Sequence, residues 1–262
     1  LYLLMRKNFV SILITNYNKS VYLKKAIDSC VNQNFENKEI LVFDDCSDDD
    51  SLNILKKYKK IKIIKNKKKK FKSGPLNQIY GLIQLFKISK GSIIFLLDSD
   101  DIFKKNKIFE ITKIFEKNKK IDFIQDTPFK SLTKKKMTLK KKKHYFSIWP
   151  SFFPTSCIAF KRSFFLDFLK VLKRDKFPNL EIDARLSIFA HIKNQFLITD
   201  KCLTIYNYDH TGISSKYKKF NKYWWKKRRE AFEYMIFLMK KLKIKLYLGP
   251  DFYFTKLINF FI

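Results

Sequence analysis

Short apolar runs alternate with amphipathic segments through the first half of the chain, and this alternation restricts the fold more than any other feature. The run "KEILVFDD" has the length and the Ile, Val and Phe content of a buried strand, whereas "SVYLKKAIDSCVNQ" spaces its apolar residues along one helix face, with Ser20 as the expected N-cap. Strands separated by helices imply an α/β fold with a mostly parallel sheet and helices on both faces. The expected strands are 9–15, 38–45, 60–66, 92–97 and 121–127, and the expected helices are 20–33, about 50–59, 75–88 and about 105–118.

The second half of the chain is less regular. The Lys-rich stretch 128–148 is expected to be a basic, mobile excursion, and a long basic helix is expected at about 219–243. The 262 residues, 46% of them hydrophobic, suit one large α/β domain with a modest extension. We therefore expect a domain over 1–215 and a basic, aromatic-rich helical C-terminal extension over 216–262. The remaining expected elements are a strand at 155–160, helices at 163–173 and 181–192, and one or two strands within 196–208.

The charge of the chain favours a nucleic-acid partner at first sight. Lys and Arg number 56 against 24 Asp and Glu, which gives a formal net charge of +32. However, Lys far outnumbers Arg, the better reader of phosphates and bases, and the joint abundance of Lys, Ile, Asn and Phe is typical of an AT-rich coding sequence. We therefore attribute part of the Lys excess to mutational bias and expect no specific nucleic-acid partner.

The cysteines and the hydropathy indicate a cytoplasmic protein. Cys30, Cys46, Cys157 and Cys202 are far apart and form no CxxC pair, so neither zinc nor a disulfide framework is supported. No uncharged apolar run reaches the roughly 18–20 residues that span a bilayer. The opening "LYLLMRKNF" is too short for a signal peptide, and Met5 is an alternative start. We expect a cytoplasmic protein, with the inner face of the plasma membrane as a peripheral location.

Carboxylates gather where the expected strands end. Asp98, Asp100 and Asp101 follow the apolar run "SIIFLL", although burying unpaired carboxylates is costly and neighbouring ones repel one another. Ligands bind at the carboxyl ends of parallel strands, and residues 16–18 and 44–45 are expected at that same edge. A divalent cation such as Mg²⁺ or Mn²⁺, which prefers oxygen ligands, would offset the charge. The alternative is a solvated turn that caps the next helix.

Four linked motifs carry a family resemblance. They are "VSILITNYNKSVYLKKAIDSCVNQNF", "EILVFDDCSDD", "KSGPLN" and "IIFLLDSDD". In this order and spacing they resemble the inverting family 2 glycosyltransferases, which have the GT-A fold, over roughly residues 9–215. Asp98-Ser99-Asp100 resembles the DxD element of nucleotide-sugar-dependent enzymes. The resemblance implies transfer of a sugar, with inversion, from a nucleotide diphosphate donor, expected to be a UDP-sugar, to a surface glycan or lipid-linked acceptor, with a divalent metal (Mn²⁺ or Mg²⁺) as cofactor.

The resemblance also implies roles for single residues on the donor side. Thr15 and Tyr17 would line the nucleotide pocket, and Asp45 matches the carboxylate that hydrogen-bonds the pyrimidine base. Lys72 would approach the diphosphate or the base, in a loop that Asn77 helps to shape. The alternatives are a helix cap for Asp45 and plain solvation for Lys72.

On the metal side, the resemblance places Asp98 near ribose or sugar hydroxyls and makes Asp100 the preferred metal ligand. "YNYDHTGISS" resembles the family's Tyr-x-x-His-x-x-Ser region, in which the His touches metal or diphosphate, and His210 fits that position. An ordinary loop histidine is the alternative for His210.

The inverting reaction needs a general base that takes the proton of the acceptor hydroxyl. The family supplies it from a Glu-Asp pair followed by Leu, and "EIDARL" offers Asp183 with the family spacing to Leu186, while Glu181 is displaced by one position. Residues 181 and 183 lie about 200° apart on a helix, so we expect only one of them to face the cleft and choose Asp183. A helix N-terminal acid favoured by the macrodipole is the alternative.

Two other functional classes stay open, because fold does not fix function. A nucleotidyltransferase would use a metal and Asp residues on a similar sheet, but its usual Gly-rich phosphate loop is absent near the start of the sequence. A basic nucleic-acid-binding protein would place Lys among aromatic residues, as 222–249 does. The same segment suits a basic amphipathic helix on anionic lipid, and we expect peripheral membrane association through it.

Overall fold

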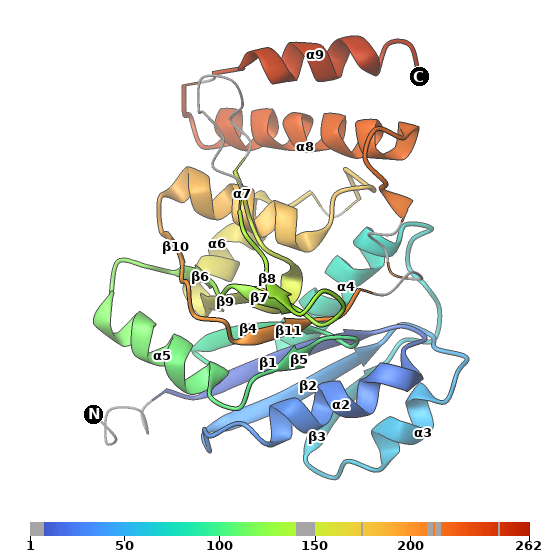
Figure 1. Cartoon of the computed structure of the whole chain (residues 1–262), viewed down its shortest axis with the longest axis vertical. Helices are drawn as coiled ribbons and strands as arrows, with labels where there is room; N and C mark the ends of the chain where they lie inside the picture. The colour runs from blue at the N-terminus through green and yellow to red at the C-terminus, as the bar shows by residue number, and fades with distance from the viewer. Residues whose placement is uncertain (1–7, 140–149, 174, 209–211, 213–215, 246) are drawn as a thin grey trace.

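A mixed seven-stranded sheet with helices on both faces organises the chain in the computed structural model, which describes residues 8–139, 150–173, 175–208, 212, 216–245 and 247–262 (Figure 1). In spatial order the strands are β10 (Phe196–Ile198), β6 (Phe123–Gln125), β9 (Ile158–Lys161), β4 (Ile93–Asp98), β1 (Val10–Asn16), β2 (Lys38–Asp44) and β3 (Ile61–Lys65). The pairs β4–β1, β1–β2 and β2–β3 are parallel, whereas β9 runs antiparallel to both of its neighbours. The expected mostly parallel α/β sheet is therefore confirmed.

Successive side chains of the central strands enter two separate cores. In β1, Ile12 and Ile14 face one core while Leu13 faces the other, and Phe95 and Leu96 of β4 divide in the same way. Because both faces are buried, these strands form continuous apolar runs in the sequence. One face is covered by α2 (Ser20–Val31), α3 (Ser51–Lys56) and α5 (Lys107–Lys117), and the other by α4 (Gly74–Ile88), α6 (Arg162–Val171) and α7 (Ile182–Lys193).

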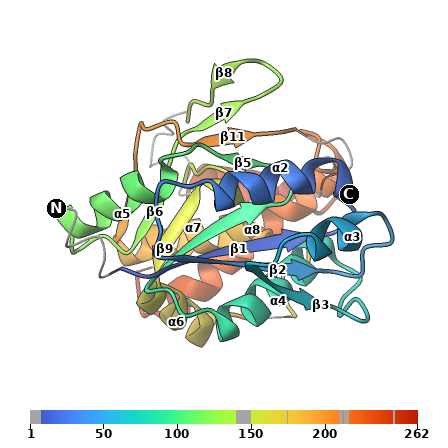
Figure 2. The same cartoon turned by 90° about the horizontal axis from the view of Figure 1, so that it is seen from below.

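A smaller four-stranded sheet flanks the central one and was not expected from the sequence (Figure 2). Its strands, in spatial order, are β5 (Ile102–Phe103), β11 (Thr204–Tyr206), β7 (Pro128–Lys130) and β8 (Lys135–Lys136). The stretch expected to be a mobile excursion thus begins as an antiparallel hairpin of β7 and β8, and its residues 140–148 lie outside the described part. The stretch 196–208 divides between the two sheets.

The start of the first helix differs from the expectation by one residue. α2 begins at Ser20, and Lys19 occupies the N-cap position that we had given to Ser20. The Ser20 N–H donates instead to Oδ2 of Asp49 at 2.8 Å, so a neighbouring loop satisfies it. At α4 the cap is Ser73, whose side chain accepts from the Leu76 N–H. Tertiary partners therefore decide where α2 starts, as they often do.

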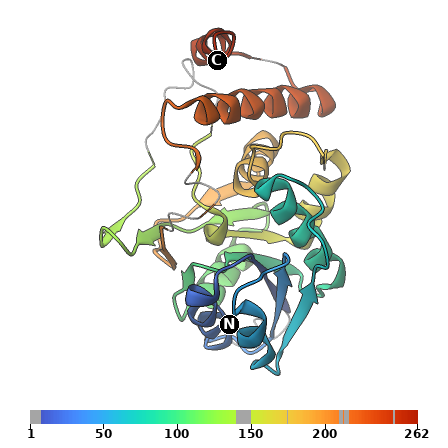
Figure 3. The ribbon, with the colours of Figure 1, turned by 90° about the vertical axis from the view of Figure 1, so that its right-hand side faces the viewer.

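The C-terminal segment forms α8 (Lys222–Lys241) and α9 (Pro250–Ile258), which stack in layers beyond α7 (Figures 1 and 3). Tyr234 and Leu238 lie in the segment 222–249, which was expected to face a membrane, but they are 0% exposed and belong to the core beside α7. For these two side chains the expectation is wrong. Phe232 packs edge to face against Phe252 of α9, with ring centroids 5.4 Å apart. None of the helices in the described part of the chain is long and apolar enough to cross a membrane. The division of the chain after residue 215 stays a prediction.

Candidate active site

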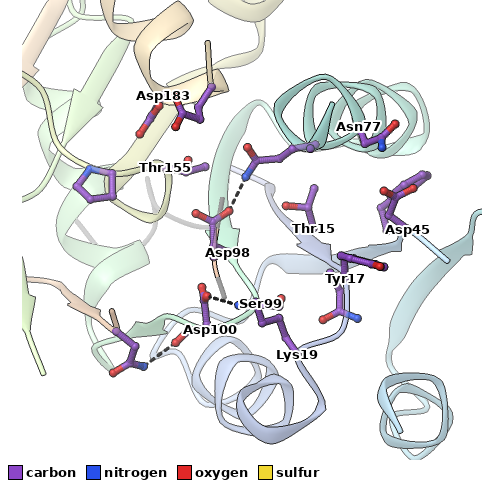
Figure 4. A pocket seen from close by; sticks show the side chains of 18 of the residues that line it. Thr15, Tyr17, Lys19, Asp45, Asn77, Asp98, Ser99, Asp100, Thr155 and Asp183 are labelled. Carbon is purple, nitrogen blue, oxygen red and sulfur yellow. Dashed lines mark hydrogen bonds and ion pairs between the residues drawn. The ribbon is translucent and has the colours of Figure 1, made fainter. Parts of the chain in front are cut away.

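A cavity of about 490 Å³ lies at the carboxyl ends of β1, β2 and β4 and extends to α7 and α8 (Figure 4). Thr15 pairs in register with both Phe43 of β2 and Asp98 of β4, which brings the ends of these strands to one level. His210 lies outside the described residues. The other predicted site residues all line the cavity, namely Thr15, Tyr17, Asp45, Lys72, Asp98, Asp100 and Asp183.

The two acids at the end of β2 have different environments. Asp44 is fully buried, and its carboxylate accepts from Nδ2 of Asn16 at 2.8 Å and from the Ser47 N–H at 3.1 Å. Asp45 lines the cavity, and its Oδ1 accepts from Nδ2 of Asn66 at 2.8 Å. Asp44 therefore holds the turn after β2, and Asp45 is the acid placed to contact a ligand.

A basic loop between β3 and α4 forms the next part of the cavity wall. The Asn77 side chain accepts from the Phe71 N–H at 2.8 Å and donates to the Phe71 carbonyl at 2.9 Å, so it shapes the loop that carries Lys72. The Lys69 ammonium also lines the cavity, 3.2 Å from the centre of the Tyr17 ring. Two cations near an aromatic ring suit an anionic, ring-bearing ligand such as a nucleotide.

The acids after β4 are largely removed from water. Oδ1 of Asp98 accepts from Nε2 of Gln78 at 2.7 Å, and Asp101, 1% exposed, accepts from the Asn207 N–H at 2.8 Å. Burial, followed by the charges of Asp100 and Asp101, raises the pKa of Asp98 well above its ordinary value. Burial and Asp100 also raise the pKa of Asp101 to about 8. Positive charge near Asp98, Asp100 and Asp101 would stabilise the ionised forms of these acids.

Lys19 supplies one such charge, since its Nζ lies 3.2 Å from Oδ2 of Asp100 (Figure 4). Within the described residues, no three His, Cys, Asp or Glu side chains are grouped so as to hold a metal ion by themselves. Mg²⁺, however, is commonly bound by one or two carboxylates together with waters and substrate phosphates. The carboxylates of Asp98 and Asp100 therefore fit a hard divalent cation that arrives with a diphosphate.

Asp183 lies in the first turn of α7, beyond Asp98 as seen from Asp100 (Figure 4). Its Oδ1 accepts from the Ala184 N–H at 2.6 Å. Burial and the charge of Glu181 raise the pKa of Asp183 to about 7, although Lys227 acts in the opposite direction. A pKa near the working pH is the favourable value for a general base.

The expectation that only one of residues 181 and 183 faces the cavity is wrong. Glu181 precedes α7 as its N-cap residue, with an extended backbone (φ −68°, ψ 166°), so the angular spacing of a helix does not apply to it. Both Glu181 and Asp183 line the cavity.

Several cavity residues were not found from the sequence. Lys69 is one of four consecutive lysines, and nothing in that run distinguishes it. Lys227 belongs to "KKRR", which places a cation on every side of α8, and it lies outside the segment that resembles the family. Lys19 and Gln78 reach the acids through folding alone. Lys19 lies inside the first motif and Gln78 directly follows "KSGPLN", but neither residue was assigned a role.

Comparisons with known proteins agree with this geometry. A family profile described as "Glycosyl transferase family 2" matches residues 11–180. The UDP-Glc:alpha-D-GlcNAc-diphosphoundecaprenol beta-1,3-glucosyltransferase WfaP of Escherichia coli is 38% identical over 101 residues, which are 38% of this chain and 38% of that protein. The chain spans about two fifths of the length of such curated relatives.

Solved structures show the same fold. Residues 1–349 of S. aureus TarS in complex with UDP-GlcNAc superpose with a TM-score of 0.62 at 16% identity, over 86% of this chain and 66% of that one. The mannosyltransferase PcManGT from Pyrobaculum calidifontis in complex with GDP-Man and Mn²⁺ gives a TM-score of 0.62 at 11% identity, over 97% and 69%. The expected GT-A fold is confirmed. The family profile matches well over half of this chain's residues, and the chain therefore belongs to glycosyl transferase family 2.

Proposed function

We propose that the protein is an inverting glycosyltransferase that moves a sugar from a nucleotide diphosphate donor to an acceptor hydroxyl. The observation that carries the proposal is the arrangement of one cavity, with Lys69 and Lys72 in one wall, Asp98 and Asp100 after β4, and Asp183 beyond them. Such a site offers cations for a diphosphate, oxygen ligands for a metal and a base for a hydroxyl. Membership of the family supports this assignment.

In this proposal, each group of cavity residues has a separate role. Thr15, Tyr17 and Asp45 bind the nucleoside, and the lysines of the basic loop neutralise the diphosphate. The Asp183 carboxylate takes the proton of the acceptor hydroxyl while that oxygen attacks the anomeric carbon opposite the departing diphosphate, which inverts the configuration. A divalent cation held by Asp98 and Asp100 would stabilise the negative charge of the leaving group.

A UDP-sugar is the donor that we propose. WfaP is named for UDP-Glc and TarS was solved with UDP-GlcNAc, whereas PcManGT holds GDP-Man. Thermal unfolding with Mn²⁺ and each of these nucleotide sugars tests the choice, since a ligand at 100 times its Kd stabilises the native state by about 2.7 kcal/mol. We expect a UDP-sugar to raise Tm more than GDP-Man does. No rise in Tm with any nucleotide sugar would contradict the proposed function.

Asp100→Asn should remove the metal dependence of the reaction. The variant keeps the size of the side chain at a turn, so the fold should persist, but it loses the charge that attracts the cation. We expect the Mn²⁺-dependent increase in UDP-sugar hydrolysis to disappear, as measured by release of UDP with and without Mn²⁺. Glu36→Gln, at an exposed acid outside the cavity lining described here, serves as the control. The same Mn²⁺ response in Asp100→Asn and wild type would exclude Asp100 as a metal ligand.

We further propose that the acceptor is lipid-linked and that the protein meets it at an anionic membrane. WfaP is named for a diphosphoundecaprenol-linked acceptor. At the start of α8, the ring centroids of Phe220 and Trp224 lie 5.4 Å apart, and between α8 and α9 those of Trp225 and Phe254 lie 5.8 Å apart. Phe220 and Phe254 are exposed. Exposed lysines lie beside these rings in 216–222. Aromatic rings suit the membrane interface and lysines suit anionic lipid.

The membrane proposal is tested with substitutions on α9. Truncation after Ser215 would remove Tyr234 and Leu238 from the core, so it cannot separate binding from folding. The double variant Phe254→Ser/Leu257→Ser changes side chains that are 57% and 55% exposed. We expect it to sediment less than wild type with phosphatidylglycerol vesicles, and we expect salt to weaken wild-type binding.

Leu132→Ser is the matched control for this experiment, because Leu132 is 74% exposed and lies on the β7–β8 hairpin. Its sedimentation should equal that of wild type. Equal binding of wild type to neutral and anionic vesicles, or unchanged binding of the α9 variant, would contradict membrane association through this surface.

A further inference from the structure

We propose that Lys227 of α8 is a positioning residue of the candidate active site, where its ammonium group holds Glu181 and keeps a positive charge beside Asp183. The inference rests on the proposed function, in which Asp183 is the general base. It makes α8 part of the reaction centre, a role that the sequence analysis did not assign to this segment.

The contacts of Lys227 fix its ammonium group at the wall of the cavity. Nζ donates to the Glu181 carboxylate at 2.5 Å, and the two side chains are 25% and 11% exposed. The same Nζ lies 4.6 Å from the centre of the Tyr217 ring. Lys227, Glu181 and Asp183 all line the cavity. A partly buried pair of this kind is screened by salt much less than a surface pair.

A second connection ties α8 to the same segment. Glu230 follows Lys227 by three residues, so both lie on one side of the helix. Its carboxylate accepts from the N–H of Asn179 at 2.7 Å and from Nδ2 of Asn179 at 2.5 Å, and the Tyr217 hydroxyl donates to Oδ1 of Asn179 at 3.2 Å. The segment that leads into α7 is therefore attached to α8 both at Asn179 and at Glu181.

Arg185 binds the same segment, the residues before α7, from within the protein core. Its fully buried guanidinium donates to the carbonyls of Leu180, Lys176 and Phe177 at 3.0, 2.6 and 2.7 Å. Arg185 thus fixes the backbone before α7, while Lys227 supplies a charge at the cavity itself. Arg185 and Lys227 therefore have separate roles, and Lys227 is the one that lines the cavity.

The charges that face Asp183 show what Lys227 contributes. Glu181 is negative and Lys227 is positive, and Asp98 is the third titratable group, with a pKa that burial and neighbouring acids raise well above its ordinary value. Burial and Glu181 raise the pKa of Asp183, and Lys227 lowers it, with the result at about 7. Without the ammonium group, Glu181 would repel the Asp183 carboxylate without compensation, so the pKa of Asp183 would rise. The base would then stay protonated, and inactive, up to a higher pH.

The experiment measures the pKa of Asp183 directly, by ¹³C NMR titration of Asp-labelled protein with the resonance assigned by its loss in Asp183→Asn. We expect Lys227→Met to raise this pKa by about one pH unit, the scale of a single nearby charge, and Lys227→Arg to leave it near the wild-type value. Glu181→Gln in the Lys227→Met background should lower it again. Lys226→Met, one residue away and not among the described residues that line the cavity, is the control.

Enzyme kinetics supply the second readout. The acidic limb of the pH profile for UDP-sugar turnover should move upward by the same amount in Lys227→Met, with kcat at pH 7 about fivefold lower, because the ionised fraction of the base falls from about one half to about one eleventh, and with the donor KM unchanged. Lys227→Gln repeats the test if the Met variant unfolds. An unchanged Asp183 pKa in folded Lys227→Met or Lys227→Gln overturns the inference. Failure of wild type to turn over any nucleotide sugar overturns the proposed function instead, and the titration distinguishes the two results because it needs no substrate.

Discussion

Asp183→Asn should transfer sugar at least about 10²-fold more slowly than wild type, the usual scale for the loss of a general base. Asn preserves the size of the side chain and can still accept the hydrogen bond from the Ala184 N–H, but it cannot take up the proton of the acceptor hydroxyl. Donor binding should be largely intact, because the donor side of the cavity is formed by other elements. Initial rates of transfer and calorimetric titration with the donor measure the two properties separately.

The pH profile provides an independent check of the same assignment. Burial and Glu181 raise the pKa of Asp183 to about 7, so the base becomes ionised, and wild-type transfer should rise, as pH increases through that value. This limb should be missing in Asp183→Asn. Glu181→Gln is the comparison, since both acids line the cavity. If Glu181→Gln is the inactive variant and Asp183→Asn transfers normally, the base is Glu181.

The strands of the central sheet could be predicted because the pattern that identifies each strand lies within its own sequence. β1, β2 and β4 are buried on both faces, which requires continuous apolar runs, and such runs are visible without knowledge of the fold. The smaller sheet could not be predicted in the same way. β5 and β8 have two residues each, and β8 is a pair of lysines, so their own sequences do not mark them as strands. β5 is defined by pairing with β11, about 100 residues along the chain, and β8 by pairing with β7 in a hairpin.

The residues of the candidate site also fall into two groups, those that local motifs predict and those that they do not. Asp45, Lys72, Asp98 and Asp100 belong to motifs that lie within a few residues of a strand or helix end, and the structure places all four at one cavity. Their individual roles stay predictions. Lys227 reaches that cavity from α8, and no local pattern specifies where a long side chain on a distant helix will end. Glu181 was misjudged for a different reason, because α7 begins at Ile182, one residue later than the sequence suggested.

The amphipathic pattern of α8 also did not reveal whether this helix packs against lipid or against the protein core. An apolar stripe beside basic residues fits a lipid surface and a protein core equally well. The structure buries Tyr234 and Leu238 of α8 and leaves part of α9 exposed, including Phe254 and Leu257.

A buried ion pair behind the acid cluster joins the two sheets. Lys107 and Asp126 are both 0% exposed, and Nζ of Lys107 donates to Oδ1 of Asp126, to the Ser156 carbonyl and to the Thr204 hydroxyl, each at 2.6 Å. The Ser156 hydroxyl in turn accepts from the Asp98 N–H at 3.0 Å. These contacts connect α5, β6 and β11 directly beneath the turn that carries the acids.

Removal of one partner should therefore destabilise the protein strongly. We expect Lys107→Met to lower the free energy of unfolding by about 3–5 kcal/mol, because it leaves the Asp126 carboxylate buried without its counter-ion. The double variant Lys107→Met/Asp126→Asn removes both charges and should lose less than the sum of the two single variants. Urea unfolding of the four proteins gives the coupling energy between the two sites.

The pH dependence of that loss separates an uncompensated charge from a simple packing defect. Burial already raises the pKa of Asp126 in the intact pair, and the loss of Lys107 would raise it further. A carboxyl group whose pKa is higher in the folded than in the unfolded state is best tolerated at low pH, where it is protonated in both. The stability deficit of Lys107→Met should therefore shrink as the pH falls through the raised pKa of Asp126 and persist at neutral pH. A deficit that is constant from neutral to acidic pH would mean that the cavity left by the lysine stem, and not the stranded carboxylate, accounts for the instability.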